Sequence, residues 1–269
     1  MRGASAESLA VLAEELTSAV DGGADASRLA DDLFGVSAVL RREPSLRRVA
    51  TDVSLASQAK ADLMRQLFRE QLAPASLELV ARAAGLRWAG TRDLGDALED
   101  LGVVAVVKAA DRAGQADALE DELFAFGQLV TGNPALRDAL SDPARSEADK
   151  RALLHDLLDG RVGPATLRLA EQAVAGTHRT VSVAIEEYQK VAAEHRDRLV
   201  ATIRVARELD DAERQRLQRA LAGQYGRPVH VNVVVDPEVL GGVKVEIADD
   251  VIDGTVASRL DDARRRLAS

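Results

Sequence analysis

Residues 29–47 read LADDLFGVSAVLRREPSLR, and residues 119–137 read LEDELFAFGQLVTGNPALR. The two stretches align without a gap at a separation of 90 residues, and the match continues to residues 83 and 173. Sixteen of the 55 aligned pairs are identical, whereas chance in a chain this rich in alanine and leucine gives roughly one in ten. A period of 90 residues is too long for a solenoid unit, so the sequence predicts a domain copied in tandem.

The spacing of apolar residues inside each copy is helical. They recur every three or four positions, as on one face of an amphipathic helix. Pro74 and Pro164 each precede such a run, where the first helical turn tolerates proline because its missing N–H would have no partner. The predicted stripes are Leu9, Leu12, Leu16 and Val20; Leu29, Leu33, Val36 and Leu40; Leu63, Met64, Leu67 and Phe68; Leu119, Leu123, Phe126 and Val130; and Leu153, Leu154, Leu157 and Leu158.

Residues 94–113 form one long helical pattern that is apolar on more than one face. A helix that is apolar around most of its girth is buried or contacts two neighbours. We therefore expect this helix to close the first bundle and to open the second.

The period changes to two near residue 199, which predicts strands at 199–205, 229–235 and 243–247. Asp210 and Asp211 are expected to cap a helix between the first two strands. A last helix is expected to carry Val256, Leu260, Ala263 and Leu267. The predicted fold is mainly α, with helical bundles at 1–93 and 94–198 and a small α/β module at 199–269 that consists of β-α-β, a hairpin and a covering helix.

Composition excludes several classes of function. The 269 residues include no cysteine, which rules out disulfides, thiol catalysis and cysteine-bound metals. A net charge of −9 disfavours nucleic acid as a partner. No apolar segment approaches the roughly 20 residues that span a bilayer, and the first residues do not resemble a secretion signal. We expect a soluble, intracellular protein that reaches a membrane only through partners.

Isolated motifs do not predict catalytic chemistry. The four histidines are far apart and lack metal-ligand spacing. Gly241-Gly242 belongs to no phosphate-binding pattern, and Asp249, Asp250 and Asp253 lack the remaining ligands of a calcium loop. The sequence therefore predicts no catalytic residue, no metal site and no cofactor. Arg264-Arg265-Arg266 lies near the end of the expected last helix, where positive charge suits the helix dipole or meets an acidic partner.

Residues 235–247, VDPEVLGGVKVEI, and 251–256, VIDGTV, followed by Arg259-Leu260, resemble the C-terminal signature of the delta subunit of bacterial F-type ATP synthases, the counterpart of the mitochondrial oligomycin-sensitivity-conferring protein. The second copy also resembles the N-terminal bundle of that family, and together the match covers about residues 94–269. Ala248, Thr255 and Ala257 depart mildly from the family pattern. The extra first copy resembles the doubled form of actinobacterial delta subunits.

The resemblance implies a non-catalytic stator subunit at the cytoplasmic face of the plasma membrane. Such a subunit links the alpha/beta catalytic head to the membrane-anchored b-subunit stalk, so that rotor torque drives ATP synthesis, and it contacts further synthase subunits. A groove between two bundle helices would hold the N-terminal helix of an alpha subunit, and the α/β module would hold the b subunit. The expected groove residues are Val104, Val107, Leu167 and Val174, and the expected b-subunit face is Val251, Ile252, Leu260 and Leu267.

Two other interpretations remain open. The chain could be a helical-repeat adaptor of another complex, with the α/β module as an association unit. It could instead be an enzyme with a site in the α/β module, although no triad, dyad or ligand set supports this. Which copy binds the alpha subunit, and whether both do, stays undecided at this level.

Overall fold

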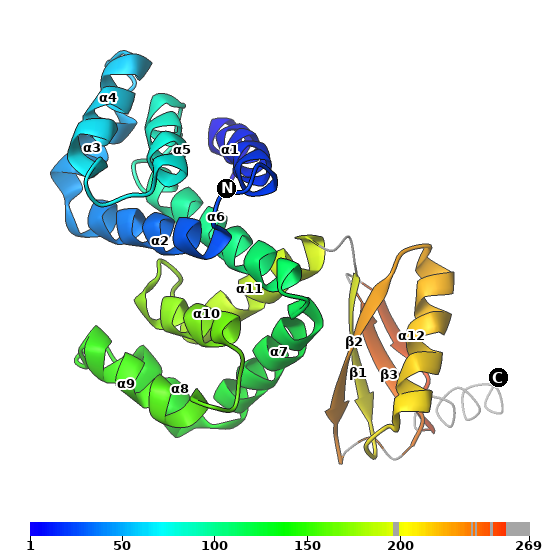
Figure 1. Cartoon of the computed structure of the whole chain (residues 1–269). Coiled ribbons are helices and arrows are strands. Elements are labelled where there is room, and N and C mark those ends of the chain that lie inside the picture. The colour runs from blue at the N-terminus through cyan, green and yellow to red at the C-terminus, as the bar shows by residue number, and fades with distance from the viewer. Residues whose placement is uncertain (196–198, 238, 240, 248–249, 257–269) are drawn as a thin grey trace, which may run out of the picture. The chain divides into compact units, whose positions relative to one another are not determined.

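The computed structural model describes residues 1–195, 199–237, 239, 241–247 and 250–256. The chain divides into two compact units, Met1–Val191 and Ala192–Ser269. The first unit is helical and the second carries the sheet (Figure 1). No helix in the described ranges combines the length and apolarity needed to cross a bilayer.

The helices of the first unit repeat along the chain. The first copy contains α1 (Ala4–Asp21), α2 (Ala26–Arg42), α3 (Pro44–Thr51), α4 (Ser57–Phe68) and α5 (Pro74–Gly85). The helices α7 (Ala116–Gly132), α8 (Pro134–Ser141), α9 (Glu147–Leu158) and α10 (Pro164–Ala175) have the bounds of α2 to α5 shifted by 90 residues. The predicted tandem repeat is therefore also a repeat of helix lengths and loop lengths.

Local chemistry explains where these helices begin. Proline occupies the first turn of α3, α5, α8 and α10, where its missing N–H costs no hydrogen bond. Asp25 caps α2 by accepting hydrogen bonds from the backbone of Ser27 and Arg28, and Asn133 caps α8 through Leu136. Such caps satisfy N–H groups that have no partner within the helix.

The helix α6 (Asp93–Arg112) belongs to both copies. It packs on α1, α2 and α5 of the first copy and on α7 and α10 of the second. Its buried residues cover most of its girth and include Leu94, Leu98, Leu101, Val103 and Val107. This helix therefore contacts both copies, which lie within the single unit Met1–Val191. The helix α11 (Val181–His195) follows and runs across the boundary between the two units.

The second unit is a four-stranded mixed sheet with one described helix. Its elements are β1 (Leu199–Val205), α12 (Asp211–Tyr225), β2 (Val229–Val235), β3 (Val243–Ile247) and β4 (Asp250–Asp253). The strand order is β2-β1-β3-β4, with β1 and β2 parallel and the other neighbours antiparallel. The buried cluster consists of Ala201, Ile203, Val205, Leu221, Val229, Val231, Val245 and Ile247.

The three predicted strands and the capped helix are confirmed. Asp210 caps α12 in a reciprocal capping box with Glu213. The fourth strand, β4, was not predicted because it is four residues long and only partly buried. The predicted last helix lies outside the described residues beyond Val256.

Candidate functional site

A cleft opens on the first copy between α1, α4 and α5. Its volume is about 720 Å³, and its walls include the small residues Ala19, Ala61 and Ala75 together with Leu79. Small side chains such as Ala19 and Ala75 let a helix approach the backbone closely, whereas Leu79 is only 4% exposed and belongs to the core beneath the cleft. The lining also includes the charged residues Glu15, Arg65, Glu78 and Arg82, so a helix docked in this cleft would meet small side chains and charges together.

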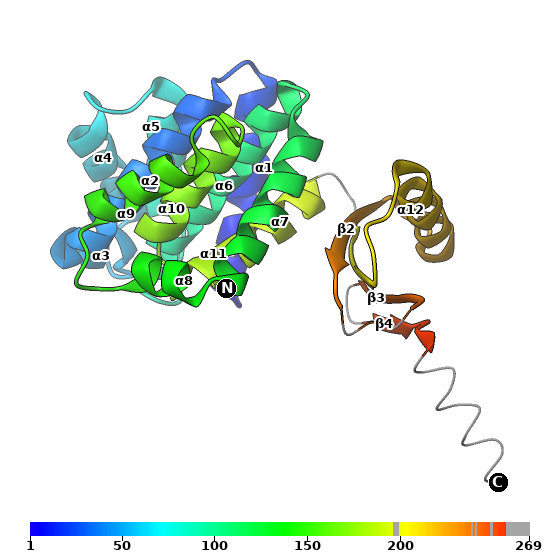
Figure 2. The ribbon, with the colours of Figure 1, turned by 90° about the horizontal axis from the view of Figure 1, so that it is seen from below.

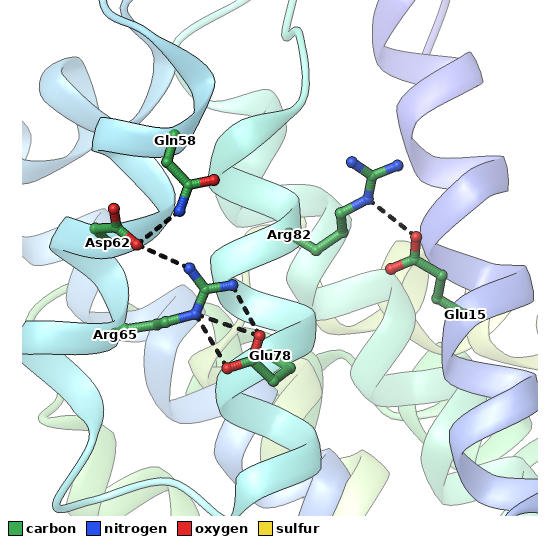
Figure 3. Close-up of polar contacts among 6 residues, drawn as sticks. All are labelled: Glu15, Gln58, Asp62, Arg65, Glu78 and Arg82. Carbon is green, nitrogen blue, oxygen red and sulfur yellow. Dashed lines mark hydrogen bonds and ion pairs between the residues drawn. The ribbon is translucent and has the colours of Figure 1, made fainter.

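Two ion pairs cross the rim of this cleft (Figure 3). Arg65 on α4 binds Glu78 on α5 through two parallel contacts, Nε to Oε1 at 3.0 Å and Nη2 to Oε2 at 2.8 Å. Arg82 on α5 contacts Glu15 on α1, with Nε 3.0 Å from Oε1. The hydrogen bonds from Arg65 lower the pKa of Glu78 and raise the pKa of Arg65. The Arg65–Glu78 pair therefore stays charged at neutral pH.

The second copy contains the corresponding pair of helices. The helix α6 takes the place of α1, and α10 takes the place of α5, since these helices are 90 residues apart along the chain. The four residues expected to line this groove come from the two helices, which pack on each other. Val104, Leu167 and Val174 are partly exposed, whereas Val107 is buried. Their contact with a partner stays a prediction.

The helix α2 of the first copy lies beside this second groove. Asp31 on α2 contacts Arg168 on α10, with 2.7 Å between the carboxylate Oδ1 and the guanidinium Nε. The same guanidinium lies 4.6 Å from the centre of the Phe34 ring, within the range of a cation–π contact. Sequence reasoning missed α2 at this position, because the repeat describes each copy separately.

A buried acidic group joins α6 to the end of the second copy. Glu99 is fully buried and accepts hydrogen bonds from the backbone N–H of Thr177 at 2.7 Å and from the Tyr188 hydroxyl at 3.1 Å. Burial, together with the charges of Glu99 and Asp96, raises the pKa of Asp100 to about 7. This carboxyl therefore titrates near neutral pH.

Asp100 makes stability depend on pH. Between about pH 4 and pH 7 the folded chain holds a proton that the unfolded chain releases, so the free energy of unfolding falls as pH rises through this range. The melting temperature of the wild-type chain should therefore decrease from about pH 5 to about pH 8. In Asp100→Asn we expect this decrease to be smaller by about 5 °C. Thermal melts of both proteins at the two pH values measure the effect. Equal losses in the two proteins would contradict the assignment.

Two of the four residues of the expected b-subunit face, Val251 and Ile252, lie on β4. Val251 on β4 is 61% exposed, and Ile252 packs partly against the sheet core. Leu260 and Leu267 lie outside the described residues. Within the described ranges, no group of three or more histidine, aspartate or glutamate side chains is placed to hold a metal ion.

Comparisons with known proteins match nearly the whole chain. Residues 103–267 match the family model described as ATP synthase delta (OSCP) subunit. A protein named ATP synthase subunit delta from Nocardioides sp. is 55% identical, over 100% of this chain and 97% of its own length. Proteins of the same name from Streptomyces avermitilis and Streptomyces coelicolor are 47% and 45% identical, over 99% and 100% of this chain. These alignments include the first copy.

Proposed function

Because the chain belongs to the ATP synthase delta (OSCP) subunit family and is a non-catalytic stator subunit of that enzyme, we propose which part of it holds which partner. The helical unit binds the N-terminal helix of an alpha subunit of the catalytic head. The α/β module binds the end of the b-subunit stalk. The protein thereby acts as a peripheral part of the synthase at the cytoplasmic face of the plasma membrane.

The observation that carries the proposal for the alpha subunit is the cleft of the first copy. Helix-in-groove recognition needs an elongated surface that accepts anchors at positions i, i+3, i+4 and i+7. The cleft between α1, α4 and α5 offers small residues on its walls and fixed ion pairs on its rim. A helix docked there would contact the small residues of the walls and the charged side chains of these ion pairs.

The proposal for the b subunit rests on the sheet edge. The strand β4 is the last strand in the order β2-β1-β3-β4, so one of its sides is not paired within the described sheet. The exposed Val251 adds apolar area on that strand. The unpaired backbone groups of an edge strand can pair with a further strand or be covered by a partner.

A stator subunit transmits force and catalyses no reaction. Tying the head to the stalk stops the head from rotating with the rotor, so that torque does work at the catalytic sites. Two separate binding units on one chain suit this task, because each end can be bound independently. The contacts with the catalytic head and with the stalk must both withstand the torque of the rotor.

The test is a pair of titrations with the full-length chain. One uses a peptide of the alpha-subunit N-terminal helix and the other a C-terminal fragment of the b subunit, both from the same organism, and each is repeated with the other partner saturating. We expect both to bind and neither to displace the other. Mutual displacement, or no binding of either partner by the folded chain, would contradict the proposal.

A single substitution on β4 separates the two contacts. We expect Val251→Asp to weaken binding of the b-subunit fragment about tenfold or more, because a charge would be placed in an apolar contact. Affinity for the alpha-subunit peptide should stay within about twofold of wild type. Val183→Asp is the control, since Val183 is an exposed valine on α11. Equal effects of the two variants on b-subunit binding would argue against the β4 surface.

A further inference from the structure

The two copies carry the same helix groove in different surroundings. Ala19 and Ala75, which line the cleft of the first copy, correspond to Ala109 and Ala165 in the second. The latter two residues line a smaller crevice of about 300 Å³ that is also lined by α2. In the second copy, therefore, part of the equivalent surface faces a helix of the same chain.

Polar contacts hold α2 to the second copy along its length. Near the start of α2, Asp31 pairs with Arg168. Arg168 corresponds to Glu78, which lines the first cleft. Near the end of α2, Arg42 contacts Glu147 at 2.9 Å, and Glu147 corresponds to Ser57, another cleft residue. Both views of the ribbon show α2 beside α10 (Figures 1 and 2).

Close packing seats α2 on α6. The helix α6 has glycine at position 102, and a Cβ atom there would lie 2.5 Å from Cε1 of Phe34. Two turns closer to the start of α6, the Ser37 hydroxyl donates a hydrogen bond to the backbone carbonyl of Gly95 at 2.8 Å. A glycine at a helix contact and a hydrogen bond from a serine to the backbone of the neighbouring helix both indicate that the two helix backbones lie close together.

Burial differs at two pairs of corresponding positions on the facing helices. Gln172 is 4% exposed, whereas the side chain of its counterpart Arg82 is 53% exposed. Ala105 is fully buried, whereas its counterpart Glu15 is partly exposed on the rim of the first cleft. At these two positions the second copy is more buried than the first, whereas Ala109 and Ala165 are partly exposed, as their counterparts Ala19 and Ala75 are.

We infer that α2 is a built-in occupant of the second copy's groove, so that, within the part of the chain the structure describes, the groove of the first copy alone is open to a partner helix. The chain then takes one alpha-subunit helix rather than two. The ratio of one alpha-subunit helix per chain rests on the proposed function. The position of α2 is independent of that proposal.

The contacts of α2 indicate what the open groove accepts. Three residues of α2, Ser27, Ala30 and Asp31, line the crevice, and Phe34 contacts Arg168. These four residues occupy positions i, i+3, i+4 and i+7 of one helix face. We therefore expect the helix that docks on the first copy to present small residues and one aromatic ring at this spacing.

The test locks α2 in place and then measures binding. The chain has no cysteine, so Asp31→Cys combined with Arg168→Cys places a single pair that a short bismaleimide can bridge. We expect nearly complete cross-linking within the chain, and the locked protein should bind one alpha-subunit peptide with an affinity within about twofold of wild type. The variant Ala75→Arg should bind at least about tenfold more weakly, whereas the matched variant Ala165→Arg should bind as wild type does.

The outcomes separate this inference from the proposed function. Poor cross-linking, two peptides per chain, or weaker binding after locking or in Ala165→Arg would overturn the inference. Unchanged binding by Ala75→Arg would overturn it as well. If the cross-link forms but the wild-type chain binds no peptide, the proposed alpha-subunit contact fails while the position of α2 stands. Thermal melts of Ala75→Arg and Ala165→Arg confirm that both variants are folded.

Discussion

Replacing Gly102 with valine is expected to lower the stability of the helical unit by about 3 kcal/mol or more, because a well-packed core does not accommodate added side-chain volume. A Cβ atom at this position would meet the ring of Phe34 at 2.5 to 3.0 Å. Phe34 is itself 3% exposed and contacts Arg168, so the ring has little room to move. Thermal or urea unfolding of the full chain measures the loss.

Gly35 provides the control for this prediction. It is an exposed residue of α2, and a Cβ atom added there would have nothing within 4 Å. Gly35→Ala should therefore raise stability by about 0.5–1 kcal/mol through helix propensity. The double variant Gly102→Val with Phe34→Leu should recover part of the loss, because the clash is between these two residues. Equal effects of the two glycine substitutions would contradict the close packing of α2 on α6.

Replacing Tyr188 with alanine is the second large effect, with an expected loss of about 3–5 kcal/mol. Its ring is 1% exposed, packs edge-on against His178 at 5.6 Å between ring centres, and donates its hydroxyl to Glu99. The substitution leaves a cavity and also removes a hydrogen bond from the buried Glu99 carboxylate. Calorimetry of the full chain measures the loss.

Tyr188→Phe separates the two contributions. It keeps the ring and removes the hydroxyl, so we expect a smaller loss of about 1–3 kcal/mol from the carboxylate that loses its donor. Glu99 stays buried and bonded to the Thr177 backbone in this variant. A loss in Tyr188→Phe as large as in Tyr188→Ala would show that the hydrogen bond, rather than ring burial, dominates at this site.

Residue spacing was sufficient to predict most of the helices and three strands. The apolar stripes through Leu12, Leu33 and Leu123 became buried faces, because a period near 3.6 leaves a helix no other way to bury those residues. The junction role of α6 followed from its apolar girth. The short strand β4 could not be predicted, because four partly exposed residues carry little periodic signal.

The covering of the second groove could not be predicted from the repeat. An ungapped alignment shows that two copies share their internal packing, but it carries no information on what each copy touches outside itself. One local signal was present in the sequence. Gly102 stands inside a helix where the first copy has Leu12, and a glycine inside a helix marks a close approach of another element. The helix pattern of the second copy predicts the expected groove residues Val104, Val107, Leu167 and Val174. That pattern gives no information on where α2 of the first copy lies.

In the assembled synthase, the first copy rather than the second is expected to hold the alpha subunit. Single cysteines at the matched positions Ala75 and Ala165, in a chain that has no other cysteine, each receive a maleimide photo-cross-linker before assembly with the other subunits. We expect the alpha subunit to be cross-linked from position 75 and not from position 165. Cross-linking from position 165, or from both positions equally, would contradict this assignment of the partner to the first copy.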